Sequence, residues 1–146
     1  MRQAILVGRQ KFEFRDVPVP APGPKDVLVR VRASGICASE LHDWEEGPKT
    51  PYAPGHEVAG DVVAVGPEVR LFKPGDRVTG LFHAGFADYA CIGEDRVAPI
   101  PEAIPTESAY GEPLACLLSA ARRTKVDLGD RVAVVGLGFM GLMMMQ

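Results

Sequence analysis

Short β-branched runs closed by proline and glycine constrain the fold of this chain more than any other feature. Five such runs fall within residues 1–100, and they read "AILV", "DVLVRVRASGI", "HEVAGDVVAVG", "GDRVTGLF" and "FADYACI". The segments between them include "PVPAPGPKD", "GPKTPYAPG" and "FKPGD". The 13 prolines and 16 glycines of the chain favour tight turns between short strands. The pattern therefore predicts a mainly β fold, a small and irregular β-barrel.

Two stretches depart from the β pattern and predict helices. "CASELHDWEEG" has good helix formers before a glycine stop at Gly47. "TESAYGEPLACLLSAARRTKV" has apolar residues at helical spacing and basic residues near its C-terminal end, where the helix dipole favours them. Thr106 is a candidate N-cap of this second helix, and Pro113 indicates a break or a restart within it.

The sequence period changes after Gly129. "DRVAVVGLGFMGLMMMQ" predicts a buried strand over residues 132–135, a glycine-rich turn and the start of a helix, which is the opening of a βαβ unit. Gly136, Gly138 and Gly141 fit the pattern G-x-G-x-x-G. Glycines at these positions permit a tight turn, close approach of a pyrophosphate and close packing of helix on strand. The chain therefore has the beginning of a dinucleotide site, and we expect it to be a truncated part of a longer protein.

Composition and charge exclude several classes of function. The net charge is −3, from 16 basic and 19 acidic residues, and no cluster of Lys or Arg indicates a nucleic-acid partner. The N-terminal apolar run spans only residues 4–7, which is too short for a signal peptide or a membrane span. We therefore expect a cytoplasmic protein. The three cysteines are too few for a disulfide scaffold and are candidates for buried thiols, metal ligands or nucleophiles.

Two segments bring together side chains that bind metals. "GICASELHDW" places Cys37, Ser39 and His42 within six residues, and Ser39 and His42 would share a face of a short helix. "PGHEVAG" presents His56 at the start of a strand, after a tight Pro-Gly turn. A thiolate and an imidazole from separate elements are good ligands for zinc.

A catalytic zinc needs a third protein ligand and an open coordination position. From the residues alone, Glu57, Glu112 and Cys116 are the candidates for that third ligand. The simplest structural alternatives are a solvated strand residue for Glu57 and a core helix residue for Cys116.

Five motifs in order resemble the zinc-dependent medium-chain alcohol and polyol dehydrogenases, specifically their GroES-like catalytic domain. The motifs are "GICASELH", "PGHEVAGDVVAVGPEV", "FKPGDRV", "GEPLAC" and "VAVVGLGFMG", and they cover essentially the whole chain. The resemblance implies a GroES-like irregular β-barrel with short helices, followed by the β-α stub of a Rossmann domain. It divides the chain into a catalytic domain (residues 1–105), a connecting helical segment (106–129) and the first strand and helix start of the Rossmann domain (130–146).

The resemblance also assigns metal ligands. It implies that Cys37 and His56 bind the catalytic zinc, and that Glu57 is a ligand or holds the metal-bound water. In the third-ligand region Glu112 is favoured, because "HDW" and "EPL" together are typical of the polyol branch of the family. Cys116, at the position of the cysteine found in alcohol dehydrogenases, stays the alternative.

Further roles follow from the same resemblance. Ser39 matches the family's proton-relay hydroxyl, His42 the base at the end of that relay, and Glu40 the acidic residue that orients the zinc histidine. The four-cysteine lobe of many members is missing between "GDRV" and "GFADY". We therefore expect one catalytic and no structural zinc, with His83 and Cys91 as ordinary loop and strand residues.

The implied function is a zinc-dependent oxidoreductase that transfers hydride between an alcohol or polyol and NAD or NADP. Its partners would be a small-molecule substrate and further copies of itself. Because the cofactor site is incomplete at Gln146, we expect this fragment to be inactive alone and its apolar tail to drive self-association. The alternatives are a non-enzymatic GroES-like module for metal binding or protein association, and a zinc-free reductase; the set Cys37, His56 and Glu57 argues against the latter.

Overall fold

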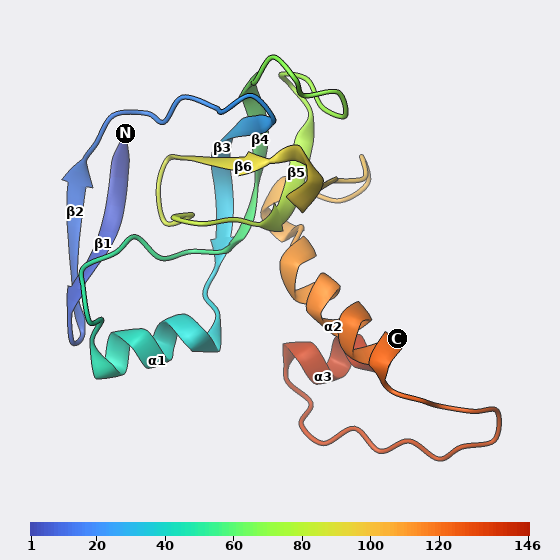
Figure 1. Cartoon of the computed structure of the whole chain (residues 1–146). Coiled ribbons are helices and arrows are strands. Elements are labelled where there is room, and N and C mark those ends of the chain that lie inside the picture. The colour runs from blue at the N-terminus through green and yellow to red at the C-terminus, as the bar shows by residue number, and fades with distance from the viewer. The chain divides into compact units, whose positions relative to one another are not determined.

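The chain divides into two compact units. The computed structural model describes all residues, 1–146, and the units are Met1–Gly111 and Glu112–Gln146. The first unit contains every strand (Figure 1). The strands are β1 (Arg2–Gly8), β2 (Lys11–Asp16), β3 (Asp26–Gly35), β4 (Glu57–Val65), β5 (Arg77–Leu81), β6 (Tyr89–Gly93) and β7 (Val97–Pro99).

The helices are short. The first unit contains one whole α-helix, α1, and two single turns of 3-10 helix. The helix α2 begins at the boundary between the units. The predicted division into residues 1–105, 106–129 and 130–146 stays a prediction. None of the helices is both long and apolar enough to span a bilayer. They are α1 (Ala38–Glu46), η1 (Glu94–Arg96), η2 (Thr106–Ser108), α2 (Gly111–Arg123) and α3 (Phe139–Met144).

Antiparallel pairing builds two sheets in the first unit. The larger sheet has the strand order β6-β3-β4-β5-β7, and β1 and β2 form a separate hairpin (Figure 1). The mainly β fold predicted from the sequence is confirmed. Side chains alternate along each strand, so β-branched residues two positions apart reach the same core. The buried core consists of Val27, Val29, Val58, Val62, Val78, Phe82, Ala90 and Ile92.

Two strands were not expected from the sequence, and both are edge strands. β2 reads "KFEFRD" and is largely exposed, so it buries too little to produce a strong apolar pattern. Its Phe14 lies under the guanidinium group of Arg2, 5.1 Å from ring centre to carbon. β7 has three residues and ends at Pro99, which an edge strand tolerates because one side of it needs no hydrogen-bond donors.

The first predicted helix is confirmed as α1, and the second begins later than expected. Thr106 lies in the 3-10 turn η2 and is not the N-cap of α2, which starts at Gly111. Pro113 falls in the first turn of α2, where the missing N–H would have no partner within the helix. The break that Pro113 indicated therefore lies before the proline, between the two helices.

The expected strand over residues 132–135 is not formed in this structure. Val132 and Val135 are exposed and lie in irregular chain, although the helix expected after the glycine-rich turn is present as α3. A strand of a parallel sheet needs neighbours that complete its hydrogen bonds and cover both of its faces. The second unit supplies none, because all seven strands belong to the first.

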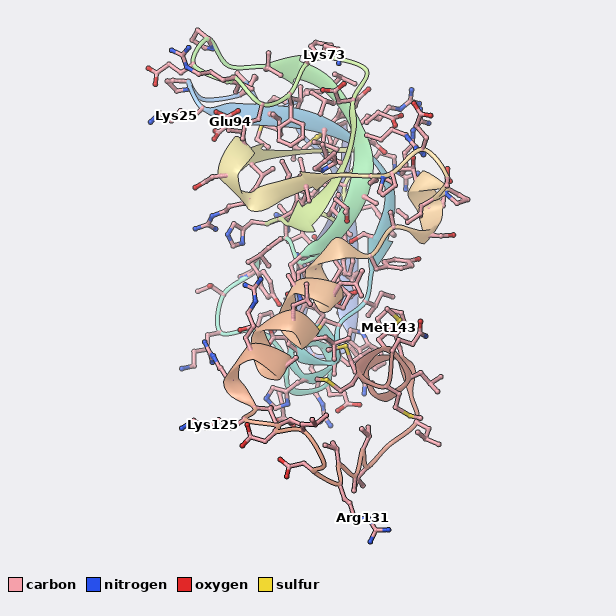
Figure 2. The ribbon with its side chains drawn as sticks, turned by 90° about the vertical axis from the view of Figure 1, so that its right-hand side faces the viewer. Lys25, Lys73, Glu94, Lys125, Arg131 and Met143 are labelled. Atoms are coloured by element: carbon pink, nitrogen blue, oxygen red, sulfur yellow. The ribbon has the colours of Figure 1, made fainter.

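A carboxylate orders the loop at one end of the large sheet. Glu94 accepts hydrogen bonds from the backbone amides of Leu71 (2.8 Å) and Arg70 (2.9 Å). These two bonds hold the pKa of Glu94 below its usual value, and the nearby charge of Lys25 adds to the effect. Figure 2 shows Lys25 and Glu94 close together at this end of the molecule, where the Glu94 amide also donates to the Lys25 carbonyl.

Thr79 in β5 links the sheet to the start of α2. Its buried Oγ1 lies 2.9 Å from the Val58 carbonyl and 2.7 Å from the Ala109 carbonyl, and it accepts a bond from the Gly111 amide at 3.0 Å. The Thr79 hydroxyl therefore lies within hydrogen-bonding distance of three backbone groups in a buried position.

We predict that Thr79→Val lowers the free energy of unfolding by about 1–3 kcal/mol, because the isosteric side chain leaves buried backbone groups unpaired. Urea denaturation measures the change. The exposed Thr124 provides a matched control, and Thr124→Val should change stability by less than about 0.5 kcal/mol. Equal effects of the two substitutions would contradict this account of Thr79.

Candidate metal centre

Three side chains of different chemistry meet where β3 ends and β4 begins. Cys37 is the N-cap of α1, two residues after β3, and His56 immediately precedes Glu57, the first residue of β4. The strands pair with Gly35 opposite Glu57, so their register brings the three residues together. The cysteine sulfur, a histidine nitrogen and a glutamate oxygen all lie within 4.8 Å of one another, and each residue is partly buried.

This spacing fits a zinc ion. Zinc bonds of about 2.0–2.3 Å in tetrahedral geometry place ligand atoms about 3.5 Å apart, so the side chains need only small movements to close on a metal. Sulfur, imidazole nitrogen and carboxylate oxygen are also the donor types that zinc takes in proteins. The convergence expected for Cys37, His56 and Glu57 is therefore present.

The buried carboxylate of Glu40 holds this site together. Its Oε2 accepts a bond from the Cys37 amide (2.9 Å), and its Oε1 lies 2.8 Å from the Gly55 amide and 3.0 Å from His56 Nδ1. The contact expected between Glu40 and the histidine is thus present. Because Nδ1 faces the carboxylate, Nε2 is the nitrogen left for a metal, and this is the usual arrangement of metal-binding histidines.

Two glycines make room for these contacts. A Cβ atom on Gly35 would lie 2.1 Å from Glu57 Oε2, so the glutamate carboxylate packs directly over the backbone of β3. Gly55 has a φ of +101°, and a Cβ there would lie 2.4 Å from the backbone nitrogen of Phe86. The turn before His56 therefore requires glycine on grounds of both conformation and space.

A cavity of about 230 Å³ adjoins His56, and Ser39, Tyr52 and His83 are among the residues that line it. The sequence predicted an ordinary loop role for His83; the structure places it in this lining. Neighbouring Ala84 adopts a φ of +58°, which is unusual for a residue other than glycine. A larger hollow of about 640 Å³ lies elsewhere, between residues 71 and 102, and contains none of the candidate ligands.

The loop that carries His83 is fastened to the segment that carries His56. Three backbone hydrogen bonds join them, from Phe82 to the His56 carbonyl (3.0 Å), from Gly85 to Gly55 (2.8 Å) and from Phe86 to Pro54 (3.0 Å). The wall of the cavity and the metal centre are therefore parts of one hydrogen-bonded framework.

The predicted relay residues lie one turn apart on α1. Ser39 and His42 are both exposed, and Ser39 lines the cavity next to His56. The helix that was expected to place them on a shared face is confirmed.

The remaining predicted site residues belong to the second unit. Glu112 and Cys116 are one turn apart on α2, with Cys116 Sγ 3.1 Å from Glu112 Oε1. In the glycine-rich turn, Gly136 has a φ of +96°, Gly138 is the N-cap of α3, and a Cβ on Gly141 would lie 1.8 Å from the Gly136 carbonyl oxygen. The tight turn expected from G-x-G-x-x-G is therefore formed.

One contact at the site was missed by the sequence analysis. The Tyr52 hydroxyl donates a hydrogen bond of 2.5 Å to Asp43 Oδ2, and the Tyr52 backbone exchanges two hydrogen bonds with Leu6 (2.9 and 3.2 Å). Burial and the bond to Asp43 raise the pKa of Tyr52 to about 12. Helical spacing relates Asp43 to Ser39, four positions earlier, but nothing in the sequence "PYAPG" marks Tyr52 as its partner.

Comparison with known proteins identifies the family. The sequence profile of the alcohol dehydrogenase GroES-like domain matches residues 23–102, more than half of the chain. The chain belongs to this family. The GroES-like fold is also that of a solved oxidoreductase/dehydrogenase of unknown specificity from Escherichia coli, with a TM-score of 0.87 and 30% identity over 97% of this chain and 52% of that one. The fold expected from the resemblance is therefore confirmed.

Curated relatives of this GroES-like domain include two with informative names. Sorbitol dehydrogenase of Bacillus subtilis (strain 168) is 31% identical, covering 98% of this chain and 51% of the relative. An uncharacterised zinc-type alcohol dehydrogenase-like protein of Escherichia coli (strain K12) is 32% identical, covering 99% of this chain and 52% of the relative. The chain thus spans about half the length of the curated relatives it matches.

We predict that Glu40→Gln destabilises the GroES-like domain by about 1–3 kcal/mol, measured by urea denaturation without metal. The Glu40 carboxylate accepts hydrogen bonds from three donors. A glutamine amide would point its NH₂ group at one or more of these donors and lose those bonds. Glu45→Gln is the control, because the exposed Glu45 side chain lies on the same helix and makes none of these contacts. A loss no larger than that of the control would contradict the role given to Glu40.

We also predict an alkaline loss of stability that depends on Tyr52. Its pKa is about 12 in the folded chain against an ordinary value of 10.0. The stabilising contribution is therefore complete below pH 10 and is lost as the pH rises from 10 to 12. Urea denaturation across that range should show a smaller decline for Tyr52→Phe. In an absorbance titration, Tyr52→Phe should remove a tyrosine ionisation near pH 12; a substitution that leaves the titration near pH 12 unchanged would contradict the assignment.

Proposed function

We propose that this chain is the metal-binding part of a zinc-dependent oxidoreductase that transfers hydride between an alcohol or polyol and NAD or NADP. The observation that carries the proposal is the meeting of Cys37, His56 and Glu57 in zinc-binding geometry, with Glu40 holding the histidine. The sorbitol dehydrogenase and zinc-type alcohol dehydrogenase among the relatives support a polyol or alcohol as the small-molecule substrate.

Cys37 and His56 are the proposed zinc ligands, and Glu57 binds the metal or its water. Glu112 is the proposed further ligand, with Cys116 as the alternative. The two lie side by side on α2, so the same turn of helix presents both a hard oxygen and a soft sulfur donor. One zinc per chain is expected, because the chain lacks the segment that holds a structural zinc in other family members.

Zinc held by these residues would supply a Lewis acid that polarises the substrate oxygen, and a bound nicotinamide would supply the hydride acceptor. The chain's own residues handle the proton. Ser39, which lines the cavity beside His56, is the proposed hydroxyl that accepts the proton of a substrate alcohol as it gives its own proton to His42. His42, exposed one turn further along α1, is the proposed base that passes the proton to solvent.

Gly136, Gly138 and Gly141 are the proposed contacts to the dinucleotide. The contact between Gly141 and the Gly136 carbonyl supports this role, because it makes the turn tight enough for a pyrophosphate to approach the backbone. A homo-oligomer is the proposed assembly; the exposed apolar side chains of α3, such as Phe139 and Leu142, supply a surface for self-association.

We predict one zinc per chain in the unsubstituted protein and loss of that zinc in Cys37→Ala and His56→Ala. Metal analysis after equilibrium dialysis measures the content. Cys91→Ala is the matched control, because Cys91 is a partly buried thiol in β6, outside the cluster, and it should keep its zinc. Unchanged zinc in both ligand variants would refute the assignment.

A further inference from the structure

The proposed zinc ligands Cys37 and His56 belong to two different elements. Zinc binding therefore requires contacts that hold these two elements in a fixed relative position. Cys37 caps the N-terminus of α1, whereas His56 ends the segment that runs from Tyr52 into β4. Glu40 joins them at the N-terminal end of the helix through the Gly55 amide and the His56 ring. Glu40 fastens only the first turn of α1, so the rotation of the helix also depends on lateral contacts further along it.

The contacts at the other end of α1 are made to backbone carbonyls rather than to side chains. The Gln10 amide donates to the Trp44 carbonyl (2.7 Å), and Arg9 Nε donates to the Glu45 carbonyl (2.8 Å). Figure 1 shows α1 lying beside the turn of the β1–β2 hairpin that supplies these donors. Terminal carbonyls of a helix point along its axis, so bonds to them locate the end of α1 more strictly than they fix its rotation.

The bond between Asp43 and Tyr52 is placed to fix the rotation. Asp43 follows Glu40 by three residues, so both side chains leave the helix on nearly the same side. Tyr52 is itself held by two backbone hydrogen bonds to Leu6, a fully buried residue of β1. The Tyr52 hydroxyl is the donor of this bond, and Asp43 Oδ2 accepts it.

We propose that Asp43 and Tyr52 form a positioning pair for the metal centre: their hydrogen bond sets the rotation of α1 and thereby the place of the Cys37 sulfur relative to His56. This inference rests on the proposed zinc function. Neither residue belongs to the cluster of candidate ligands. The pair acts through the helix that carries Cys37, Ser39 and Glu40.

Simple geometry shows why a small roll matters. Side-chain atoms lie about 5 Å from a helix axis, so a rotation of about 10° moves them by roughly 0.9 Å. Metal–ligand distances tolerate deviations of only about 0.2 Å. A hydrogen bond that prevents such a roll therefore affects metal binding even though it lies away from the metal.

The test compares zinc affinity in Tyr52→Phe and Tyr89→Phe, measured on the full chain by competition with a chromogenic chelator. Tyr89 lies in β6 and serves as the matched control. We expect Tyr52→Phe to weaken zinc binding about tenfold, in line with losses seen when residues behind metal ligands are removed. We expect Tyr89→Phe to leave the affinity unchanged. With cobalt(II) in place of zinc, the ligand-field absorption bands of Tyr52→Phe should shift or weaken, which a loss of stability alone would not cause.

Substitutions of Asp43 keep the test decisive if Tyr52→Phe folds poorly. Asp43→Asn retains an acceptor for the Tyr52 hydroxyl, so it should keep most of the zinc affinity that Asp43→Ala loses. In a double-mutant cycle, Asp43→Ala with Tyr52→Phe should cost no more than either change alone. Additive losses, or a Tyr52→Phe affinity and cobalt spectrum equal to those of Tyr89→Phe, would overturn the proposal.

The outcomes separate this inference from the function on which it rests. If the unsubstituted chain fails to bind zinc through Cys37 and His56, the proposed function itself is wrong. If it binds zinc through them and the Asp43 and Tyr52 variants bind equally well, only the positioning pair is wrong.

Discussion

The structure around the metal centre depends on the buried carboxylate of Glu40. A buried charge is costly unless several donors satisfy it, and here three donors converge on it from two elements. The same bonds close the first turn of α1, fix the Gly55 turn and orient His56. The same carboxylate therefore stabilises the local fold and positions the candidate ligands. A substitution of Glu40 should affect both.

Long-range pairing supplies the rest of the site. β3 and β4 are joined in a register that sets Gly35 opposite Glu57, and only a glycine lets the glutamate carboxylate lie across the neighbouring strand. The valine core beneath these strands makes that register costly to change, because a shift by one residue would turn buried side chains toward solvent. The β-barrel thus presents the candidate metal ligands from its loops and strand ends.

Much of this architecture was predictable from the sequence, and the exceptions have physical causes. The apolar runs predicted five strands, and the family resemblance implied that Cys37 and His56 meet at one metal site. The strand β2 was not predicted because an exposed edge strand buries few apolar side chains. The strand expected before Gly136 is absent because it has no partner strand. The bond between Asp43 and Tyr52 was beyond sequence reasoning, since it joins two segments whose approach depends on tertiary packing.

We propose that zinc binds between Cys37 and His56, with oxygen or nitrogen donors completing its coordination. X-ray absorption at the zinc edge of the loaded chain is the decisive measurement. We expect one sulfur at about 2.3 Å and the remaining ligands at about 2.0–2.2 Å. A second sulfur would show that Cys116, and not Glu112, is the further ligand. The absence of any sulfur from the zinc ligands would rule out Cys37 and refute the proposed site.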